Sequence, residues 1–158
     1  MIGVCGRLDT LQAAVLLAKW PRFAYEIEQR EANAKYYDEQ LGNRRLPFLD
    51  VMNVRSTHSS VYGQYTVTVS NREKIREELT KVGVPTAVHY PVPVGSQPGY
   101  KNCSKNNHNP VADWLSEHVL SLPSGPDLNK RDQDKVIQAL VSQCIVPEDS
   151  FLNSRMAA

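Results

Sequence analysis

The sequence predicts an α/β fold of the α+β type, in which two N-terminal helices precede a three-stranded, mainly antiparallel sheet covered by helices. Apolar residues recur at helical spacing up to residue 42, whereas from Val61 they alternate with polar residues at a period of two. Two further short apolar runs, residues 84–90 and 119–122, each follow a helical pattern. A chain of 158 residues is long enough for one domain with a substantial core.

Two helices are predicted before residue 43. In the first, residues 8–19, one apolar face is made of Leu8, Leu11, Val15 and Ala18. Most of the remaining residues of this helix are apolar too, and a helix that is apolar on nearly every side is expected to be buried. The second helix starts near Pro21 and ends at Gly42, which predicts a long arm.

The composition shifts once along the chain, at residues 43–60. This shift predicts a hinge between a helical interface arm, residues 1–42, and a small α/β domain, residues 61–149. Residues 150–158 are expected to form a flexible tail.

The α/β domain opens with a strand over residues 61–70, whose alternation indicates that one face is buried. Ser70 and Glu73 have the spacing of a capping box, which predicts a helix from this point. Gly83 is expected to end that helix.

The rest of the domain is predicted from turn and capping residues. A second strand over residues 84–90 leads into a proline-rich loop, residues 91–110, of a length usually associated with function or disorder. Asn109 and Asn129 each begin a helix, with a third strand over residues 119–122 between them. If this third strand lies between the other two, all neighbouring pairs are antiparallel and two helices cover one face.

Composition excludes several classes of protein. The net charge of +1 and the absence of a dense cluster of Lys and Arg argue against nucleic-acid and membrane partners. The longest apolar stretch, residues 11–20, is too short to span a bilayer, and no signal peptide is predicted, so a cytoplasmic location is expected. Cys5, Cys103 and Cys144 are too widely spaced to indicate a disulfide framework or, with the histidines, a metal site.

The residues alone give two weak candidates for binding. His89 and Tyr90 stand at a predicted strand end that leads into the proline-rich loop, where binding residues are common, although a lone histidine is more often structural. Residues 3–7 could hold an anion through backbone N–H groups and Arg7 ahead of a helix, but two glycines three apart are a weak signal.

Four stretches in order make the prediction more specific. They are residues 6–14 (GRLDTLQAA), 64–67 (QYTV), 85–93 and 97–98 (PTAVHYPVP, QP), and 120–123 and 126–128 (LSLP, PDL). Together they resemble the DegT/DnrJ/StrS family of sugar aminotransferases over nearly the whole chain, from about Gly3 to about Leu140.

The resemblance implies both fold and activity. The chain is similar to the C-terminal small domain of a fold-type-I aminotransferase. Members of this family depend on pyridoxal phosphate, and they transfer an amino group from glutamate to a keto sugar on a nucleotide carrier.

The resemblance also implies binding residues. In the family, an Asn-x-Arg pair reaches the neighbouring subunit's cofactor phosphate and substrate, and a His-Tyr pair lies near the substrate. These map onto Cys5 and Arg7, and onto His89 and Tyr90. Cys5 departs from the family asparagine, and a thiol is a weaker donor than an amide.

The family's Schiff-base lysine lies before the stretch that this chain resembles. We therefore expect no catalytic residue here, no pyridoxal phosphate bound to this chain alone, and no activity in isolation. The alternative is a non-enzymatic module that binds a sugar nucleotide or pairs with a full-length aminotransferase. Self-association through the N-terminal helices is the other expected partnership.

Overall fold

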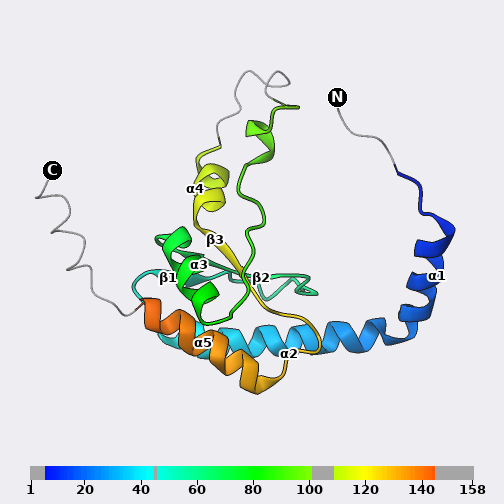
Figure 1. Ribbon diagram of the computed structural model, residues 1–158, viewed down its shortest axis with the longest axis horizontal. Helices are drawn as coiled ribbons and strands as arrows, with labels where there is room; N and C mark the ends of the chain where they lie inside the picture. Colours follow the sequence, from blue (N-terminus) through cyan, green and yellow to red (C-terminus); the bar gives the residue numbers. More distant parts are fainter. Residues whose placement is uncertain (1–5, 45, 101–108, 145–158) are drawn as a thin grey trace, which may run out of the picture.

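Figure 1 shows the computed structural model of the chain, which describes residues 6–44, 46–100 and 109–144. The helices are α1 (Thr10–Lys19), α2 (Phe23–Leu41), α3 (Arg72–Lys81), α4 (Pro110–His118) and α5 (Lys130–Cys144). The strands are β1 (Leu49–Val51), β2 (Tyr65–Val69) and β3 (Val119–Leu122). The sheet lies near the middle of the molecule, with α2 and α5 beneath it and α1 at the far end of α2 (Figure 1).

The three strands form one antiparallel sheet in the order β1-β2-β3. Leu49 pairs with Val69 across the first strand pair, and Val67 pairs with Leu120 across the second. The predicted fold class, a three-stranded antiparallel sheet covered by helices, is confirmed.

Two details of the sheet differ from the sequence prediction. Residues 84–90 form only a single antiparallel bridge, between Ala87 and Ser121, instead of a strand. Pro85 has no N–H with which to extend that ladder. The third strand of the sheet is instead β1, within residues 43–60, where no strand was predicted. As expected, β3 lies between β2 and the bridging segment.

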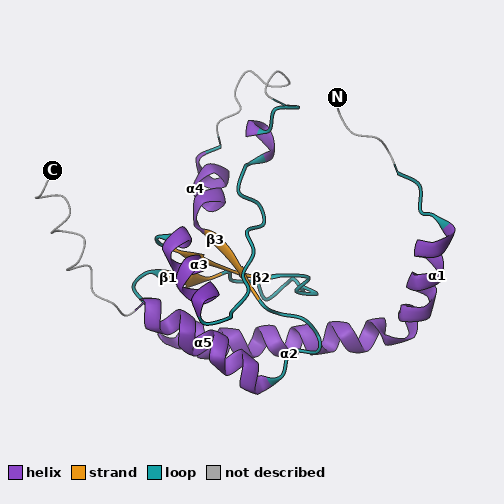
Figure 2. Ribbon diagram, in the orientation of Figure 1, coloured by secondary structure: helices purple, strands orange, loops and turns teal. Residues whose placement is uncertain are grey.

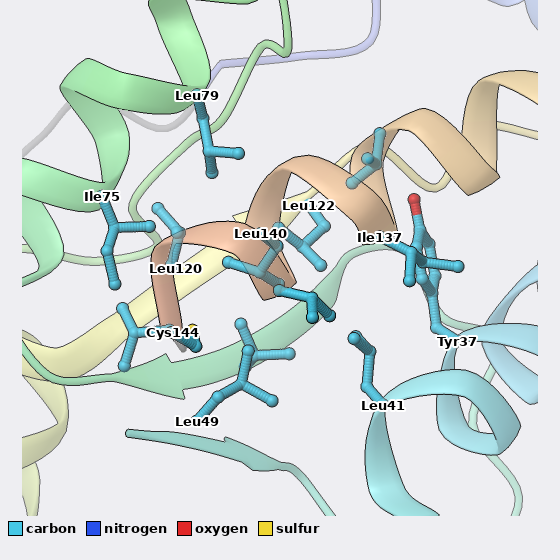
Figure 3. Close-up of a cluster of buried hydrophobic side chains, with 14 of the residues drawn as sticks. Tyr37, Leu41, Leu49, Ile75, Leu79, Leu120, Leu122, Ile137, Leu140 and Cys144 are labelled. Carbon is cyan, nitrogen blue, oxygen red and sulfur yellow. The ribbon is translucent and has the colours of Figure 1, made fainter. Parts of the chain in front are cut away.

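The core lies on one face of the sheet, where α2, α3 and α5 pack (Figures 2 and 3). Strand alternation directs the apolar residues of β2, together with Leu120 and Leu122 of β3, to this face. The side chains with no exposed surface are Ala34, Tyr37, Val67, Leu79, Leu120 and Leu140. The second half of α2 therefore belongs to the same core as the sheet.

Three helix ends in the α/β domain follow the predicted signals. The side chain of Asn109 accepts a hydrogen bond from Ala112 N at the start of α4, and that of Asn129 accepts one from Asp132 N at the start of α5. Gly83, directly after α3, has a φ of +78°, a conformation that L-residues rarely adopt. These three predictions are confirmed.

The capping box predicted at the start of α3 is wrong. Asn71 occupies the cap position in a left-handed conformation, with no hydrogen bond from a capping side chain. Glu73 instead pairs with Arg72 at 3.0 Å and with Arg76 at 2.7 Å. The hydrogen bond from Arg72, which has the largest effect, and the charge of Arg76 lower the pKa of the Glu73 carboxyl below its usual value.

A set of polar contacts ties α2 to the segment that follows β3. The Arg30 guanidinium donates to Ser124 O at 3.3 Å, Asn33 donates to Gly125 O at 2.9 Å, and the Tyr37 hydroxyl donates to Pro123 O at 2.8 Å. Because these acceptors are backbone carbonyls, α2 fixes the path of the chain directly after β3.

The first helix, which was expected to be buried, is not covered within the described chain. No residue of α1 is buried, and Leu11 is 81% exposed. A bend at Trp20–Arg22 separates α1 from α2, and α1 stands at the far end of α2, away from the sheet (Figure 1).

Replacing Leu140 by alanine is expected to lower the free energy of unfolding by about 2–5 kcal/mol, because Leu140 is fully buried and its loss leaves a cavity. Urea denaturation would measure the change. The matched control is Val82→Ala, at a side chain that is 65% exposed, which should change stability by less than about 0.5 kcal/mol. An equal effect of the two substitutions would contradict the assignment of the core.

Candidate functional site

The face of the sheet opposite the core carries hydroxyl side chains. Thr66 and Thr68 alternate with the core residues of β2, and Ser121 alternates with those of β3. The part of this face around Thr68 lies near α4, since Thr68, Trp114 and His118 line one small pocket. Thr66 and Ser121 pair directly across β2 and β3.

His89 contacts one of these two hydroxyls, that of Ser121, so that Thr66, Ser121 and His89 form a row. The Thr66 and Ser121 hydroxyl oxygens are 3.0 Å apart, and Ser121 Oγ lies 3.1 Å from His89 Nδ1. Reciprocal backbone hydrogen bonds between Ala87 and Ser121, at 3.1 and 2.8 Å, hold the segment that carries His89 against β3. Ala87 and His89 are two residues apart, so in extended chain their side chains fall on the same face.

Tyr90 follows at the outer edge of this cluster. Its side chain is 71% exposed, and its ring stands edge-on to the His89 ring with 5.6 Å between centroids. The peptide bond between the two residues is cis. His89 is half-buried, so the pair presents one anchored ring and one ring open to solvent.

The structure does not bring Arg7 to this pair. Arg7 is exposed and lies just before α1, where the Asp9 carboxylate accepts a hydrogen bond from Gln12 N at 2.8 Å. Figure 1 shows α1 and the sheet at opposite ends of α2. Cys5, the other predicted cofactor ligand, lies outside the described residues. The two halves of the predicted site are therefore separate within one chain.

The described residues do not fit pyridoxal phosphate by themselves. A Schiff-base lysine needs a neutral amine, which enzymes obtain by desolvation or a neighbouring cation. All six lysines of the described ranges are exposed. Two of them are paired with carboxylates, Lys81 with Glu78 at 2.6 Å and Lys135 with Asp132 at 2.8 Å.

Other candidate chemistries find no support in the part of the chain that the structure describes. It contains no group of three His, Cys, Asp or Glu side chains placed to hold a metal ion. Nor does any helix there have the length and apolar content needed to cross a membrane. His118 stacks on Trp114 and bonds to its carbonyl oxygen at 2.7 Å, a packing role. Burial raises the pKa of the Cys144 thiol to about 11, which leaves it unreactive.

His89 was predicted from the sequence, but its partner Ser121 and the next hydroxyl, that of Thr66, were not. Both were inside quoted motifs, QYTV and LSLP, and both alternate with apolar residues. That alternation places them on the face opposite the core. The sequence gives no sign that Ala87 pairs with Ser121, and this pairing brings His89 next to the Ser121 hydroxyl.

Comparison with known proteins identifies the family to which the chain belongs. The sequence model of the DegT/DnrJ/EryC1/StrS aminotransferase family matches residues 1–141. A relative from Pseudomonas aeruginosa, UDP-2-acetamido-2-deoxy-3-oxo-D-glucuronate aminotransferase, is 41% identical over 143 residues, which cover 89% of this chain and 38% of the relative.

Solved structures show the same similarity. A DegT DnrJ EryC1 StrS aminotransferase from Brucella abortus matches with a TM-score of 0.79 and 34% identity, over 92% of this chain and 38% of that one. DesV from S. venezuelae, solved in complex with a ketimine intermediate, matches with a TM-score of 0.81 and 31% identity, over 92% of this chain and 39% of that one. The chain spans less than two fifths of each of these proteins, and it belongs to the DegT/DnrJ/EryC1/StrS aminotransferase family.

Proposed function

We propose that this chain is the C-terminal portion of an aminotransferase that uses pyridoxal phosphate and glutamate to aminate a keto sugar carried on a nucleotide. The family match and the 41% identity to an enzyme named for a UDP-linked 3-oxo sugar support the proposal. The observation that carries it within the structure is the anchored His89 beside the exposed Tyr90.

The proposed role of each residue is the one that the family resemblance implies. His89 and Tyr90 contact the nucleotide sugar, and Arg7 contacts a phosphate group of the cofactor or the substrate. A guanidinium bound to phosphate forms charge-assisted hydrogen bonds, which are about twice as strong as neutral ones. Cys5 lies two residues before Arg7 in the sequence and contributes a weaker contact to the cofactor phosphate.

The site is completed by residues that this chain does not supply. Within one copy, α1, which Arg7 precedes, and the sheet that anchors His89 lie at opposite ends of α2 (Figure 1), so Arg7 and His89 serve one site only when a second subunit or a preceding domain lies between them. The six lysines of the described residues support the same conclusion, because all of them are exposed. The chain alone is therefore inactive.

A chimeric enzyme tests this proposal. The chain replaces the matched C-terminal part of the Pseudomonas aeruginosa relative, and transamination is followed with glutamate and the 3-oxo sugar nucleotide of that relative. We expect activity from the chimera and none from the chain alone. An inactive chimera that folds and binds the cofactor would contradict the proposal.

Within the chimera, Arg7→Ala is expected to weaken binding of the sugar nucleotide or the cofactor about 10- to 100-fold, the loss expected for a hydrogen bond to a charged group of about 1.5–3 kcal/mol. Calorimetric titration of both ligands measures it. Arg22→Ala is the matched control, since Arg22 is also exposed but lies beyond α1, 4.0 Å from Asp127. Unchanged affinity for both ligands in Arg7→Ala would remove Arg7 from the site.

A further inference from the structure

Only one order of hydrogen-bond donation gives every hydroxyl proton of the row formed by Thr66, Ser121 and His89 an acceptor within the row. Ser121 Oγ contacts both of its neighbours, at 3.0 Å and 3.1 Å, and its single proton can go to only one of them. If Thr66 donates to Ser121 and Ser121 donates to His89 Nδ1, both hydroxyl protons are used. In the reverse order the Thr66 proton has no acceptor in the row, and if Ser121 accepts from both neighbours its own proton has none.

The first order fixes the state of the imidazole ring. A neutral histidine whose Nδ1 accepts a hydrogen bond carries its proton on Nε2. Nε2 has no hydrogen-bond partner among the residues that the structure describes, and the ring is half-buried beside the exposed Tyr90. The proton on Nε2 is thus available to a ligand.

We propose that Ser121, itself oriented by Thr66, is a positioning residue that holds His89 as a hydrogen-bond donor through Nε2. The group that His89 recognises is then an acceptor, such as a hydroxyl, carbonyl or phosphate oxygen. This identity of the ligand group rests on the proposed function, whereas the order of the row does not.

The buried position of Ser121 favours this role over a solvent-facing one. Its side chain is 5% exposed, so its hydroxyl exchanges few hydrogen bonds with water. The strand that carries it is held by β2 on one side and by the Ala87 bridge on the other. Both partners of the hydroxyl are therefore fixed by backbone pairing, and the imidazole has little freedom to turn away.

Nitrogen-15 NMR of the ligand-free chain at alkaline pH, where imidazole is neutral, tests the order. The ring nitrogen shifts report the ratio of the two tautomers, and a His89→Gln variant assigns the signals. We expect the Nε2–H tautomer to dominate. Ser121→Ala should lower its ratio to the other tautomer about fivefold, which corresponds to one hydrogen bond of about 1 kcal/mol.

Two further variants sharpen the test. Thr66→Val should also lower the ratio, because Ser121 loses the donor that orients it; a rise or an unchanged ratio would overturn the proposed order. Ser116→Ala is the matched control, since Ser116 is another buried serine, whose hydroxyl donates to Asp113 O within its own helix. An unchanged ratio in Ser121→Ala, or dominance of the Nδ1–H tautomer, would overturn the positioning role.

The ligand half of the proposal is tested separately in the chimera. There Ser121→Ala should raise KM for the sugar nucleotide about fivefold, the same loss of about 1 kcal/mol, with the affinity for the cofactor unchanged. An unchanged KM would overturn recognition through His89. Because the tautomer ratio is measured without ligand or activity, failure of the amination assay and failure of the positioning role remain distinguishable.

Discussion

Pyridoxal phosphate mixed with the purified chain is expected to form no stoichiometric covalent adduct with a lysine. Such an adduct needs a neutral amine held beside the carbonyl carbon of the cofactor. The lysines at residues 19, 35, 74, 81, 130 and 135 are all exposed. For Lys81, the hydrogen bond to Glu78 raises the pKa further, which favours the unreactive ammonium form.

The measurement is an absorption spectrum after removal of excess cofactor. The chimera with the upstream part of the Pseudomonas aeruginosa relative is the positive control and should show a stoichiometric cofactor band. The chain alone should show at most weak, lysine-independent absorption. A stoichiometric band that one Lys→Ala substitution abolishes would contradict the prediction and place a complete cofactor site within this chain.

The fold could be predicted where a local signal and the tertiary structure agree. The second helix was expected to end at Gly42, and α2 ends at Leu41, just before it. Strand 119–122 and the caps at Asn109 and Asn129 agree as well, because side-chain hydrogen bonds and short apolar runs act over a few residues.

The sequence predictions failed where the structure depends on contacts between residues that are far apart in the sequence. β1 is only three residues long and depends on pairing with β2, so residues 49–51 carry no periodic signal of their own. Residues 84–90 have the composition of a strand, but Pro85 limits them to one bridge. Similarly, the partner of His89 is Ser121 on β3, which in turn contacts Thr66 on β2, and no local pattern connects these segments.

The purified chain is expected to self-associate through α1 and the first turns of α2. Along these elements, large apolar side chains are exposed at Leu8, Leu11, Val15, Leu16, Leu17, Trp20, Phe23 and Tyr25. Contiguous apolar surface of this kind is uncommon on soluble monomers beyond a few hundred Å² and usually marks an interface. α1 has no buried residue, so nothing in the described chain covers this surface.

The exposed apolar surface of α1 and the first turns of α2 is separate from the core, which the second half of α2 shares with the sheet. From Ala34 onward α2 packs into the core, and Tyr65 stacks on Tyr37 with 4.7 Å between ring centroids. Burial, together with a hydrogen bond to Asp38, raises the pKa of the Tyr65 hydroxyl, as expected for an anchored side chain. The first turns of α2 extend past the sheet (Figure 1), and Phe23 and Tyr25 are the exposed apolar side chains there.

Light scattering over a range of concentrations measures the association. Leu11→Glu and Leu16→Glu each place a charge within the apolar surface and should shift the chain toward monomer, because a carboxylate buried in an interface loses its hydration. Val111→Glu is the matched control, at an exposed valine in the first turn of α4, where a negative charge is compatible with the helix dipole. A folded monomer at high concentration in the unaltered chain would show that α1 needs no partner, and an equal effect of Val111→Glu would place the contact elsewhere.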